Sequence, residues 1–571
     1  MAVDGRANGL RWRLQAMRRL WSPGARPEMN FLPPLPVAES IEGEVDCPGA
    51  GVEIDEERID VNGWVAFEDG PTARVEAWLD DVPLGRARVG LPRPDLVGVK
   101  HLPNVAYAGF ELGADLSVLA DSDRFGPRTV KVVATAVSGR RHEFEPILLK
   151  IDPPAATAVS ETIPTPAVAP PRDGVLRVLV ITHQLTLGGA QLYLLDLLHG
   201  LRTEAEGKIE FTVVSSMDGP LRDELDEMGI PVHLTSASAG DDAAAHRGRV
   251  EELAAWLAPH RFDVALVNTA TTAAFTGAEA AGRLGIPAVW AIHESFPPAL
   301  LWAELEPELR AQAEEAVGAA AFAVFEADAT RRIFEPLVDP ERCRTLPYGV
   351  DFSTIERARE GFDRAAERRR SGLPEDADVL VCIGTVEPRK AQLPLAQAFE
   401  LIAARHPRAR LVFVGGRRKD QHTIVLAEFI EASSVGDRIE LIPITPDVQR
   451  WYGLADVLVC ASDIESLPRT VLEAMAWETP VLATSVFGLP ELIDDGETGW
   501  LCEPRDISRL AAALDDVLGQ PPEARDRIAA NARALVEQRH SLPNYAEEMS
   551  RLLREAAGAS SKREPRRTTS G

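Results

Sequence analysis

The sequence predicts an α/β protein in which two Rossmann-like units face each other across a cleft, preceded by a small all-β sandwich domain. From residue 175 onward, buried strand patterns alternate with helical patterns, which is typical of parallel sheets covered by helices. Before the alternation begins, residues 40–151 carry short strand patterns without intervening helices. The chain length of 571 residues suits about three to four domains.

Composition narrows the class of protein further. Hydrophobic residues make up 45% and charged residues 26% of the chain, as in ordinary folded proteins. The formal net charge of -27 argues against a nucleic-acid binder, because an acidic body would be pressed against phosphates. The five cysteines are scattered without a C-x-x-C pair, so neither a zinc site nor a disulfide framework is expected. A reducing cytoplasm fits this cysteine usage.

Residues 1–39 form a basic segment that breaks the acidic trend. Within residues 1–26, six arginines face one acidic residue, Asp4. Apolar residues recur there at helical spacing, namely Leu10, Leu14, Met17 and Trp21. Two interpretations stay open, an amphipathic helix lying on an anionic membrane and a solvated terminus. We therefore expect a cytoplasmic protein whose N-terminal segment would make any peripheral contact with the inner face of the plasma membrane.

The β-sandwich is expected over residues 40–151, followed by a Pro/Ala-rich linker over residues 152–174. Glycine, proline and aspartate punctuate the sandwich at short intervals. Its expected strands are 61–67, 74–79, 110–112, 129–137 and 147–151. The linker cannot bury enough apolar surface to fold and is expected to be an extended spacer.

The two Rossmann-like units are expected over residues 175–353 and 354–557, with a disordered tail over 558–571. The first unit's expected strands are 176–182, 210–215, 263–268, 288–293 and 321–325. Those of the second are 378–384, 410–415, 438–442, 456–461 and 480–484. A helical stretch from about 523 to 556 follows. A cleft between two such units is where a ligand is expected.

Two motifs border this cleft from the first unit. Gly188 and Gly189 follow the first strand and open a helix, so the backbone can approach a ligand that faces the helix N-terminus. A plain strand-to-helix turn would carry the same pair. His293 ends a buried strand, where an imidazole can serve a transferring group or simply support the structure.

Two further motifs come from the second unit. Arg389 and Lys390 follow its first strand, and adjacent cations at such a turn suit a diphosphate. Glu465 lies in a loop, and Glu473 lies inside the helix that begins near Pro468. Both carboxylates can accept hydrogen bonds from sugar hydroxyls while the helix N-terminus faces a phosphate. The chain contains neither a G-x-G-x-x-G after a strand nor a P-loop, which argues against a dinucleotide enzyme or a P-loop NTPase.

These motifs, in this order, resemble the retaining GT-B glycosyltransferases of family 4 over residues 175–555. The resemblance rests on the two glutamates that are separated by seven residues, with Ala-Met-Ala after the second. It also includes Gly-Gly-Ala-Gln at 188–191, Pro-Tyr-Gly-Val-Asp at 347–351, Glu-Pro-Arg-Lys at 387–390, and the glycines of 488–499. The chain departs from the family at Tyr348, where many members carry Asn, and at 467–468, where many carry Phe-Gly.

The resemblance implies a role for each motif residue. Arg389 and Lys390 would hold the donor diphosphate, Glu473 the nucleotide ribose, and Glu465 the donor sugar. Gly188 and Gly189 would approach the sugar and phosphates from the first, acceptor-binding unit. His293 would line the reaction centre, and Leu467 would lie beside the donor.

The expected reaction moves a sugar from a UDP- or GDP-linked donor to a glycan or lipid-linked acceptor, with retention of anomeric configuration. The resemblance implies no metal and no further cofactor, because two cations and a helix dipole can neutralise the leaving diphosphate. In this family the acceptor attacks on the same face that the diphosphate leaves. Two alternatives remain, a nucleotide-sugar epimerase on the same architecture and a catalytically silent carbohydrate-binding or scaffold protein.

Overall fold

The structure is a computed structural model, which describes most of the chain from Ile41 to Lys562. The described residues are 41–49, 53–54, 58–93, 95–96, 102, 105–116, 119, 125–151, 174–205, 208–235, 243–303 and 305–562. The predicted N-terminal segment 1–39 and nearly all of the predicted linker 152–174 therefore lie outside the described residues. None of the helices that are described has both the length and the apolar character that a bilayer crossing requires.

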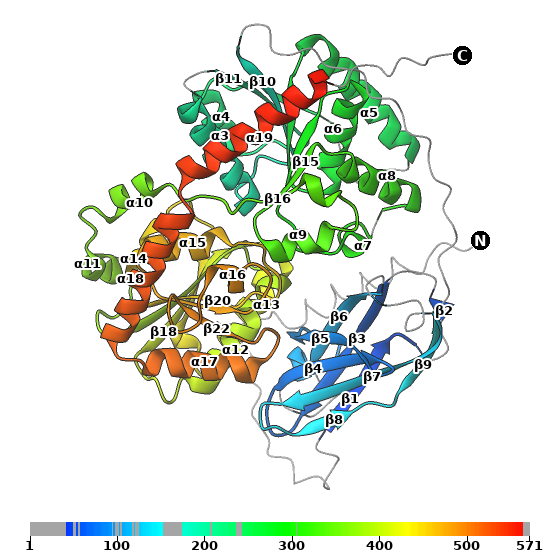
Figure 1. Cartoon of the computed structure of the whole chain (residues 1–571). Coiled ribbons are helices and arrows are strands. Elements are labelled where there is room, and N and C mark those ends of the chain that lie inside the picture. Colours follow the sequence, from blue (N-terminus) through cyan, green and yellow to red (C-terminus); the bar gives the residue numbers. More distant parts are fainter. Residues whose placement is uncertain are drawn as a thin grey trace, which may run out of the picture. The chain divides into compact units, whose positions relative to one another are not determined.

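The N-terminal module is an all-β domain, as predicted, and its strands form one hydrogen-bonded path (Figure 1). The path runs β1-β3-β6-β5-β4-β7-β9-β2, with β8 paired to β7. Its strands are β1 (Ile41–Cys47), β2 (Glu53–Ile54), β3 (Arg58–Phe67), β4 (Thr72–Leu79), β5 (Val82–Leu91), β6 (Gly109–Asp115), β7 (Gly126–Ala136), β8 (Arg141–Glu143) and β9 (Ile147–Ile151). Because β5 pairs with both β4 and β6, it joins the two halves of the sandwich.

The first α/β unit is built on a parallel sheet of order β12-β11-β10-β13-β14-β15-β16. Its strands are β10 (Leu176–Thr182), β11 (Ile209–Ser215), β12 (Val232–Leu234), β13 (Val264–Asn268), β14 (Ala288–Ile292), β15 (Phe322–Phe325) and β16 (Cys343–Thr345). Its helices are α3 (Gly189–Glu204), α4 (Leu221–Glu227), α5 (Ala243–Leu257), α6 (Thr272–Arg283), α7 (Pro298–Leu301), α8 (Pro307–Gly318) and α9 (Asp328–Phe334).

The second α/β unit has a parallel sheet of order β19-β18-β17-β20-β21-β22. Its strands are β17 (Asp378–Ile383), β18 (Ala409–Gly416), β19 (Ile439–Pro443), β20 (Val457–Cys460), β21 (Val481–Thr484) and β22 (Trp500–Cys502). Its helices include α10 (Phe352–Arg359), α11 (Arg364–Arg370), α12 (Gln392–Ile402), α13 (Gln421–Ala432), α14 (Gln449–Leu454), α15 (Arg469–Ala476), α16 (Leu489–Leu492) and α17 (Ile507–Gly519).

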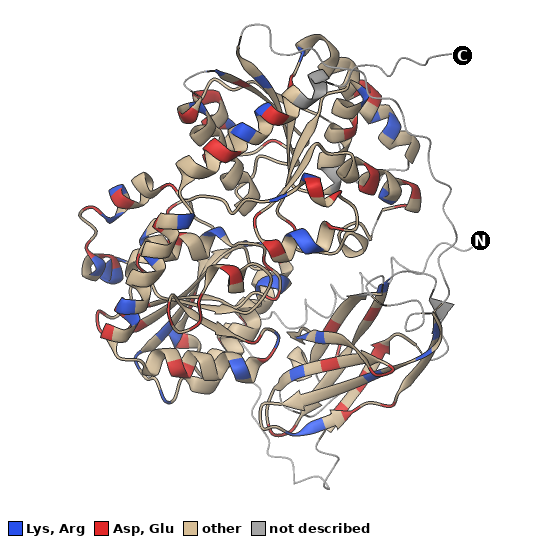
Figure 2. Cartoon of the chain, in the orientation of Figure 1, with Lys and Arg blue, Asp and Glu red and all other residues tan. Residues whose placement is uncertain are grey.

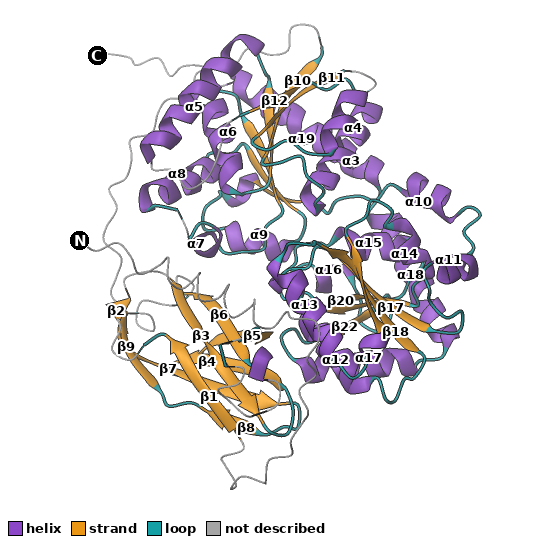
Figure 3. Cartoon of the chain, turned by 180° about the vertical axis from the view of Figure 1, so that it is seen from behind, coloured by secondary structure: helices purple, strands orange, loops and turns teal. Residues whose placement is uncertain are grey.

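Both sheets bury their two faces, which explains the continuous apolar runs of their strands. Along β10, Val178 and Val180 join one hydrophobic core, whereas Leu179 and Ile181 join another. Side chains alternate across a strand, so a strand covered on both faces needs apolar residues at every position. Figure 3 shows helices flanking the strands of each sheet on both sides. The predicted pair of Rossmann-like units is therefore confirmed.

The C-terminal helices link the two units. Helix α18 (Pro522–Arg539) packs on α15, and the following helix, α19 (Leu542–Lys562), packs on α3 of the first unit. Gly200 of α3 permits this approach, since a Cβ there would lie 3.0 Å from the Cβ of Ala546. The predicted disordered tail starts at residue 558, but α19 continues to Lys562; residues 563–571 lie outside the described part.

Candidate active site

The predicted site residues of the second unit lie where its central parallel strands end. The 3-10 turn η4 (Pro388–Lys390) follows β17, and the loop that carries Glu465 follows β20. Strands β17 and β20 are neighbours in the sheet, so both segments emerge at the same edge. The backbone N–H of Asp463 donates to the carbonyl of Arg389 over 2.7 Å and ties the two segments together.

Arg389, Lys390 and Glu465 form one charged cluster, although 75 residues separate Lys390 from Glu465. The ammonium of Lys390 donates to the Glu465 carboxylate, and an Arg389 guanidinium nitrogen lies 3.5 Å from its other oxygen. Ser462 adds a hydroxyl donor at 3.0 Å. Burial opposes the charge on Glu465, but the two cations outweigh it and lower the pKa of this carboxyl. The cluster is thus a buried carboxylate held by two cations.

Arg389 is the more accessible of the two cations. Its side chain is 32% exposed, whereas that of Lys390 is 16% exposed. A second carboxylate, that of Glu387, lies 2.6 Å from Arg389. An entering diphosphate would therefore find both cations at a sheet edge and would compete with carboxylates for them.

Glu473 lies on α15 in a separate polar cluster. Its carboxylate accepts hydrogen bonds from the Tyr452 hydroxyl over 2.7 Å and from Arg469 Nε over 2.6 Å. The same arginine lies 2.5 Å from Asp196 of α3, so it connects the two α/β units. Glu473 lines a small cavity of about 50 Å³ together with Tyr348 and other residues. A ribose that binds Glu473 must share its oxygens with Arg469 and Tyr452.

Leu467 contributes no side chain to an open site. It is 3% exposed and belongs to the hydrophobic core, and its carbonyl accepts the Tyr348 hydroxyl hydrogen. Tyr348, the position where the family often carries Asn, therefore supports the loop between Glu465 and α15 from within the first unit.

His293 follows β14 and sits between two polar side chains of neighbouring strands. Its Nδ1 is hydrogen-bonded to the Glu326 carboxylate, and its Nε2 lies 2.8 Å from the amide oxygen of Asn268. The Tyr193 ring meets the imidazole edge to face at a centroid distance of 4.6 Å. Burial lowers the pKa of His293, but the charges of Glu326 and Glu294 and the hydrogen bond to Glu326 raise it overall. The structure therefore favours the imidazolium form.

A second histidine lies beside this one. His183 hydrogen-bonds Gln191 over 2.9 Å and Thr269 over 3.2 Å. Burial, with the nearby charge of His293, lowers its pKa to about 4. The neighbouring imidazoles thus differ in charge, one neutral and one favoured as a cation.

The two predicted glycines differ in what surrounds them. A Cβ on Gly188 would lie 2.3 Å from Gln191 Oε1, so a larger residue here would displace the Gln191 side chain. A Cβ on Gly189 would meet nothing within 4 Å. Gly189 opens α3 with its backbone exposed to free space, which is the arrangement expected for close approach to a ligand.

Further polar contacts join the two α/β units around these residues. Besides the pair Asp196–Arg469, the Thr330 hydroxyl of α9 lies 2.9 Å from that of Ser466. Glu491 of α16 accepts from the backbone N–H groups of Asp328 and Ala329, at the N-terminus of α9. The carboxylate therefore caps a helix of the opposite unit, which favours a negative charge there.

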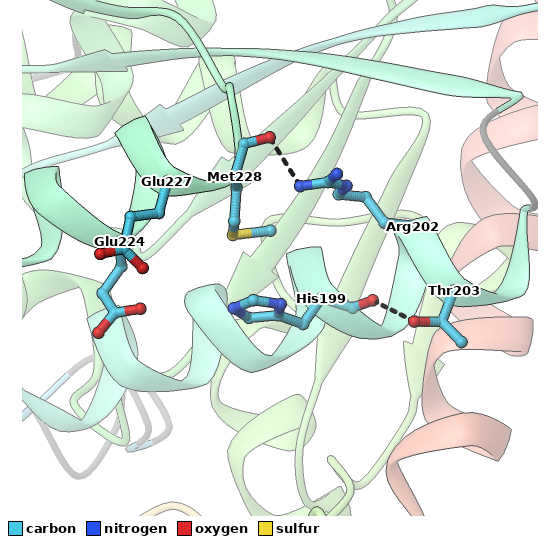
Figure 4. Close-up of a pocket in the computed structure, with 6 residues that line it drawn as sticks. All are labelled: His199, Arg202, Thr203, Glu224, Glu227 and Met228. Carbon is cyan, nitrogen blue, oxygen red and sulfur yellow. Dashed lines mark hydrogen bonds between the residues drawn. The ribbon is translucent and has the colours of Figure 1, made fainter.

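A further pocket of about 450 Å³ lies away from these residues, between α3 and α4 (Figure 4). It is polar and is lined by His199, Arg202, Thr203, Glu224, Glu227 and Met228. The guanidinium of Arg202 already donates to the Met228 carbonyl over 2.7 Å. None of its lining residues belongs to the predicted site.

Figure 2 shows acidic and basic residues interspersed along the helices of both α/β units.

Sequence reasoning missed four residues that surround the predicted ones, namely Asn268, Glu326, Asp196 and Arg469. Asn268 and Glu326 each stand at the carboxyl end of a buried strand, as His293 does. That shared position could have predicted that Asn268 and Glu326 lie near His293, because the carboxyl ends of neighbouring parallel strands meet at one edge of the sheet. Asp196 and Arg469 gave no such signal, since their pairing depends on how two distant helices face each other.

Two family models match the chain where these clusters lie. "Glycosyl transferases group 1" matches residues 363–535, and "Glycosyl transferase 4-like domain" matches residues 188–349. A D-inositol 3-phosphate glycosyltransferase of Xylanimonas cellulosilytica is 30% identical over 61% of this chain and 87% of its own length. A second relative, from Thermomonospora curvata, is 33% identical over 44% of this chain. The match spans 62% of that relative's own length, which is less than two thirds.

Solved structures agree on the fold. The structure of Anabaena HepE with UDP-glucose covers 66% of this chain and 100% of its own, with a TM-score of 0.57 and 19% identity. At that identity the likeness establishes the fold alone. The sheet orders, the matched family models and these likenesses together lead to one conclusion: the chain belongs to the family of glycosyl transferases group 1, with a GT-B fold and an N-terminal all-β module.

Proposed function

We propose that the protein is a glycosyltransferase that moves a sugar from a nucleotide-sugar donor to a hydroxyl of a glycan or lipid-linked acceptor. The observation that carries this proposal is the cluster of Arg389, Lys390 and Glu465 at the ends of β17 and β20. Two cations at that edge can stabilise the negative charge that develops on a leaving diphosphate. Glu465, held between them, would accept hydrogen bonds from the sugar being transferred.

The donor is proposed to be UDP-linked, with a GDP-linked sugar as the other candidate. Support comes from HepE, whose solved structures contain UDP, UDP-glucose, or UDP and glucose. The curated relatives are named D-inositol 3-phosphate glycosyltransferases, so inositol 3-phosphate is the first small acceptor to test. A glycan or lipid-linked acceptor stays our proposal for this chain.

Transfer is proposed to retain the anomeric configuration and to need no metal. Support for metal independence lies in the two cations and in Gly189 at the N-terminus of α3, which together offer positive charge to a diphosphate. In a retaining reaction the acceptor hydroxyl attacks on the face that the diphosphate leaves, and a phosphate oxygen takes the acceptor proton. No carboxylate nucleophile is then required.

The test has two steps. A panel of UDP- and GDP-sugars is screened by thermal shift, because a ligand that binds the native state raises the melting temperature. The sugar that shifts it most is then incubated with acceptors, with and without EDTA, and the product's anomeric configuration is read by NMR. Transfer with retention in EDTA is expected. Complete loss in EDTA, restored by Mn²⁺ or Mg²⁺, would contradict the metal-free proposal.

The same experiment separates the two alternative functions. An epimerase would convert the nucleotide-sugar in the absence of any acceptor. A silent binding protein would bind the donor tightly and show neither hydrolysis nor transfer. Transfer that depends on the acceptor would exclude both.

A further inference from the structure

A cavity of about 870 Å³ lies where the β module meets both α/β units. The β module contributes Asn62, Leu84 and Arg88, the first unit contributes Phe296 and Leu300, and the second contributes Ile464. Ligand pockets commonly have volumes of roughly 300–1,000 Å³, so the cavity is large enough for a small molecule.

The cavity borders the proposed reaction centre on both sides. Ser295, which lines it, is two residues beyond His293, and Ile464, which also lines it, directly precedes Glu465. Ser295 and Ser466 are further linked through hydroxyl contacts of 2.9 Å with Thr330. A ligand in this cavity would therefore lie next to the sugar that Glu465 is proposed to hold.

Polar contacts hold the β module against the loop that carries Glu465. Arg88 Nε of β5 donates to the Asp463 carboxylate over 3.2 Å, and Asp463 is 5% exposed. Arg505 contacts the same carboxylate at 3.6 Å and donates to the carbonyl of Arg86 over 2.5 Å. Asp463 also donates its backbone N–H to Arg389. Asp463 thus connects the β module to the charged cluster of the second unit.

Close packing also holds the β module on the second unit. The Tyr107 ring packs edge to face on Phe429 of α13 at a centroid distance of 5.6 Å. Gly90 approaches α12 closely, since a Cβ there would lie 2.8 Å from Gln397 Oε1. Apolar residues of the module and of the second unit belong to one hydrophobic core. The wall that the module supplies to the cavity therefore rests on a packed interface.

The lining combines apolar faces with paired charges. Leu84, Phe296 and Phe487 supply apolar surface, and Asn62 supplies an amide. The arginines of the lining already face carboxylates, as in the pairs Arg58–Asp60 and Arg88–Glu111. Such a lining offers little unpaired positive charge to a phosphate. It suits a neutral saccharide, whose C–H faces pack on apolar side chains while its hydroxyl groups exchange hydrogen bonds with charged and amide groups.

We propose that this cavity holds the acceptor saccharide and that the N-terminal β module forms one wall of the acceptor site. The inference rests on the proposed glycosyltransferase function and adds the substrate class and the element that selects it. The acceptor hydroxyl would enter from the cavity beside Glu465, on the face of the sugar from which the diphosphate leaves.

The test measures how tightly the full chain binds saccharides when a larger side chain from one wall fills part of the cavity. The parent protein, Leu84→Trp and the control Leu148→Trp are applied with UDP to an array of short gluco-, galacto- and manno-oligosaccharides. Leu148 lies in the same module, is 67% exposed and does not line the cavity. Leu84→Trp should weaken saccharide binding about tenfold or more, the scale on which pocket shape discriminates. Leu148→Trp should bind as the parent does.

Equal binding by the parent and Leu84→Trp would overturn the proposal, and so would a parent protein that binds no saccharide. If Leu84→Trp folds poorly, Phe296→Ser tests the opposite wall in the same assay. A UDP titration of each protein keeps the two proposals apart. Failure of the parent to bind UDP contradicts the proposed function, whereas UDP binding without saccharide binding contradicts the acceptor assignment alone.

Discussion

The His293 imidazole and the Glu326 carboxylate are hydrogen-bonded to each other, although 33 residues separate them along the chain. They come together because β14 and β15 are neighbours in a parallel sheet and each residue follows the last position of its strand. The pair gives His293 a fixed orientation, with Nδ1 toward Glu326 and Nε2 toward Asn268. Glu326 is therefore a positioning residue for the histidine that is predicted to line the reaction centre.

Glu326→Gln should lower the pKa of His293, because the neighbouring negative charge that raises it is lost. A raised histidine pKa stabilises the fold below the unfolded value of about 6.5, and that contribution disappears as pH rises through the folded pKa. The loss of unfolding free energy in Glu326→Gln should thus be largest between about pH 5 and 6.5. Denaturant unfolding at several pH values measures it.

The pH dependence of turnover in the same variant provides a second measurement. If the imidazolium form of His293 supports transfer, the fall in turnover at alkaline pH should begin at a lower pH in Glu326→Gln than in the parent. Glu306→Gln, at an exposed position before α8, serves as the control and should leave both profiles unchanged. Superimposable profiles for Glu326→Gln and the parent would show that Glu326 does not tune His293.

Arg389→Ala and Lys390→Ala should each reduce turnover by roughly 10- to 1000-fold, the range for removing a stabiliser of developing negative charge. Their effects on folding should differ. Lys390 is the closer partner of buried Glu465, so its removal leaves a less compensated charge and should also lower the melting temperature. Arg418→Ala, at an exposed arginine beyond β18, is the matched control. Full activity in both site variants would refute the diphosphate assignment.

Glu465→Gln and Glu473→Gln should separate sugar transfer from nucleotide binding. Glu473→Gln should weaken UDP by about 1–3 kcal/mol, the scale of a hydrogen bond to a charged group. It should also lower stability, because Arg469 and Tyr452 lose their charged partner. Glu465→Gln should leave UDP affinity nearly unchanged and depress turnover, since its proposed contact is with the transferred sugar. Calorimetry measures the UDP affinity of each variant, and steady-state kinetics measures its turnover. If Glu465→Gln loses UDP affinity and Glu473→Gln does not, the two assigned roles are exchanged.

Gly349→Ala should destabilise the contact between the end of the first unit and the start of α19. A Cβ on Gly349 would lie 2.4 Å from the backbone of Ser541 and Leu542, where α19 begins. Overpacking of this kind costs about 1–3 kcal/mol. Gly248→Ala is the matched control, because Gly248 lies within α5 with nothing within 4 Å of its would-be Cβ. Alanine favours a helix, so the control should be neutral or stabilising. Equal melting temperatures for the two variants would contradict this packing.

Deleting residues 1–26 should reduce sedimentation of the protein with anionic liposomes. The expectation comes from the six arginines and the apolar residues at helical spacing in this segment, which lies outside the described residues. Neutral liposomes provide the control, because they lack the charge that would attract the arginines. Unchanged sedimentation with anionic liposomes would identify the segment as an ordinary solvated terminus.

The sequence by itself determined the fold class and the order of the predicted motifs. Strand β13 is buried at every position, and such a continuous apolar run shows a strand covered on both faces. Strand β5 escaped sequence analysis, because its Pro83 and Gly85 weaken the strand pattern. Hydrogen bonds to the neighbouring strands β4 and β6 hold β5 in the sheet, although its local sequence does not predict a strand.

Only the tertiary structure decided which site residues meet. Lys390 and Glu465 share a cluster because β17 and β20 are adjacent in the sheet, a relationship that no local pattern encodes. Glu473, a turn and a half of helix beyond Pro468, instead joins Arg469 and Tyr452. Periodicity reports which face of an element is buried, whereas the partner on that face depends on strand order and on contacts between distant helices.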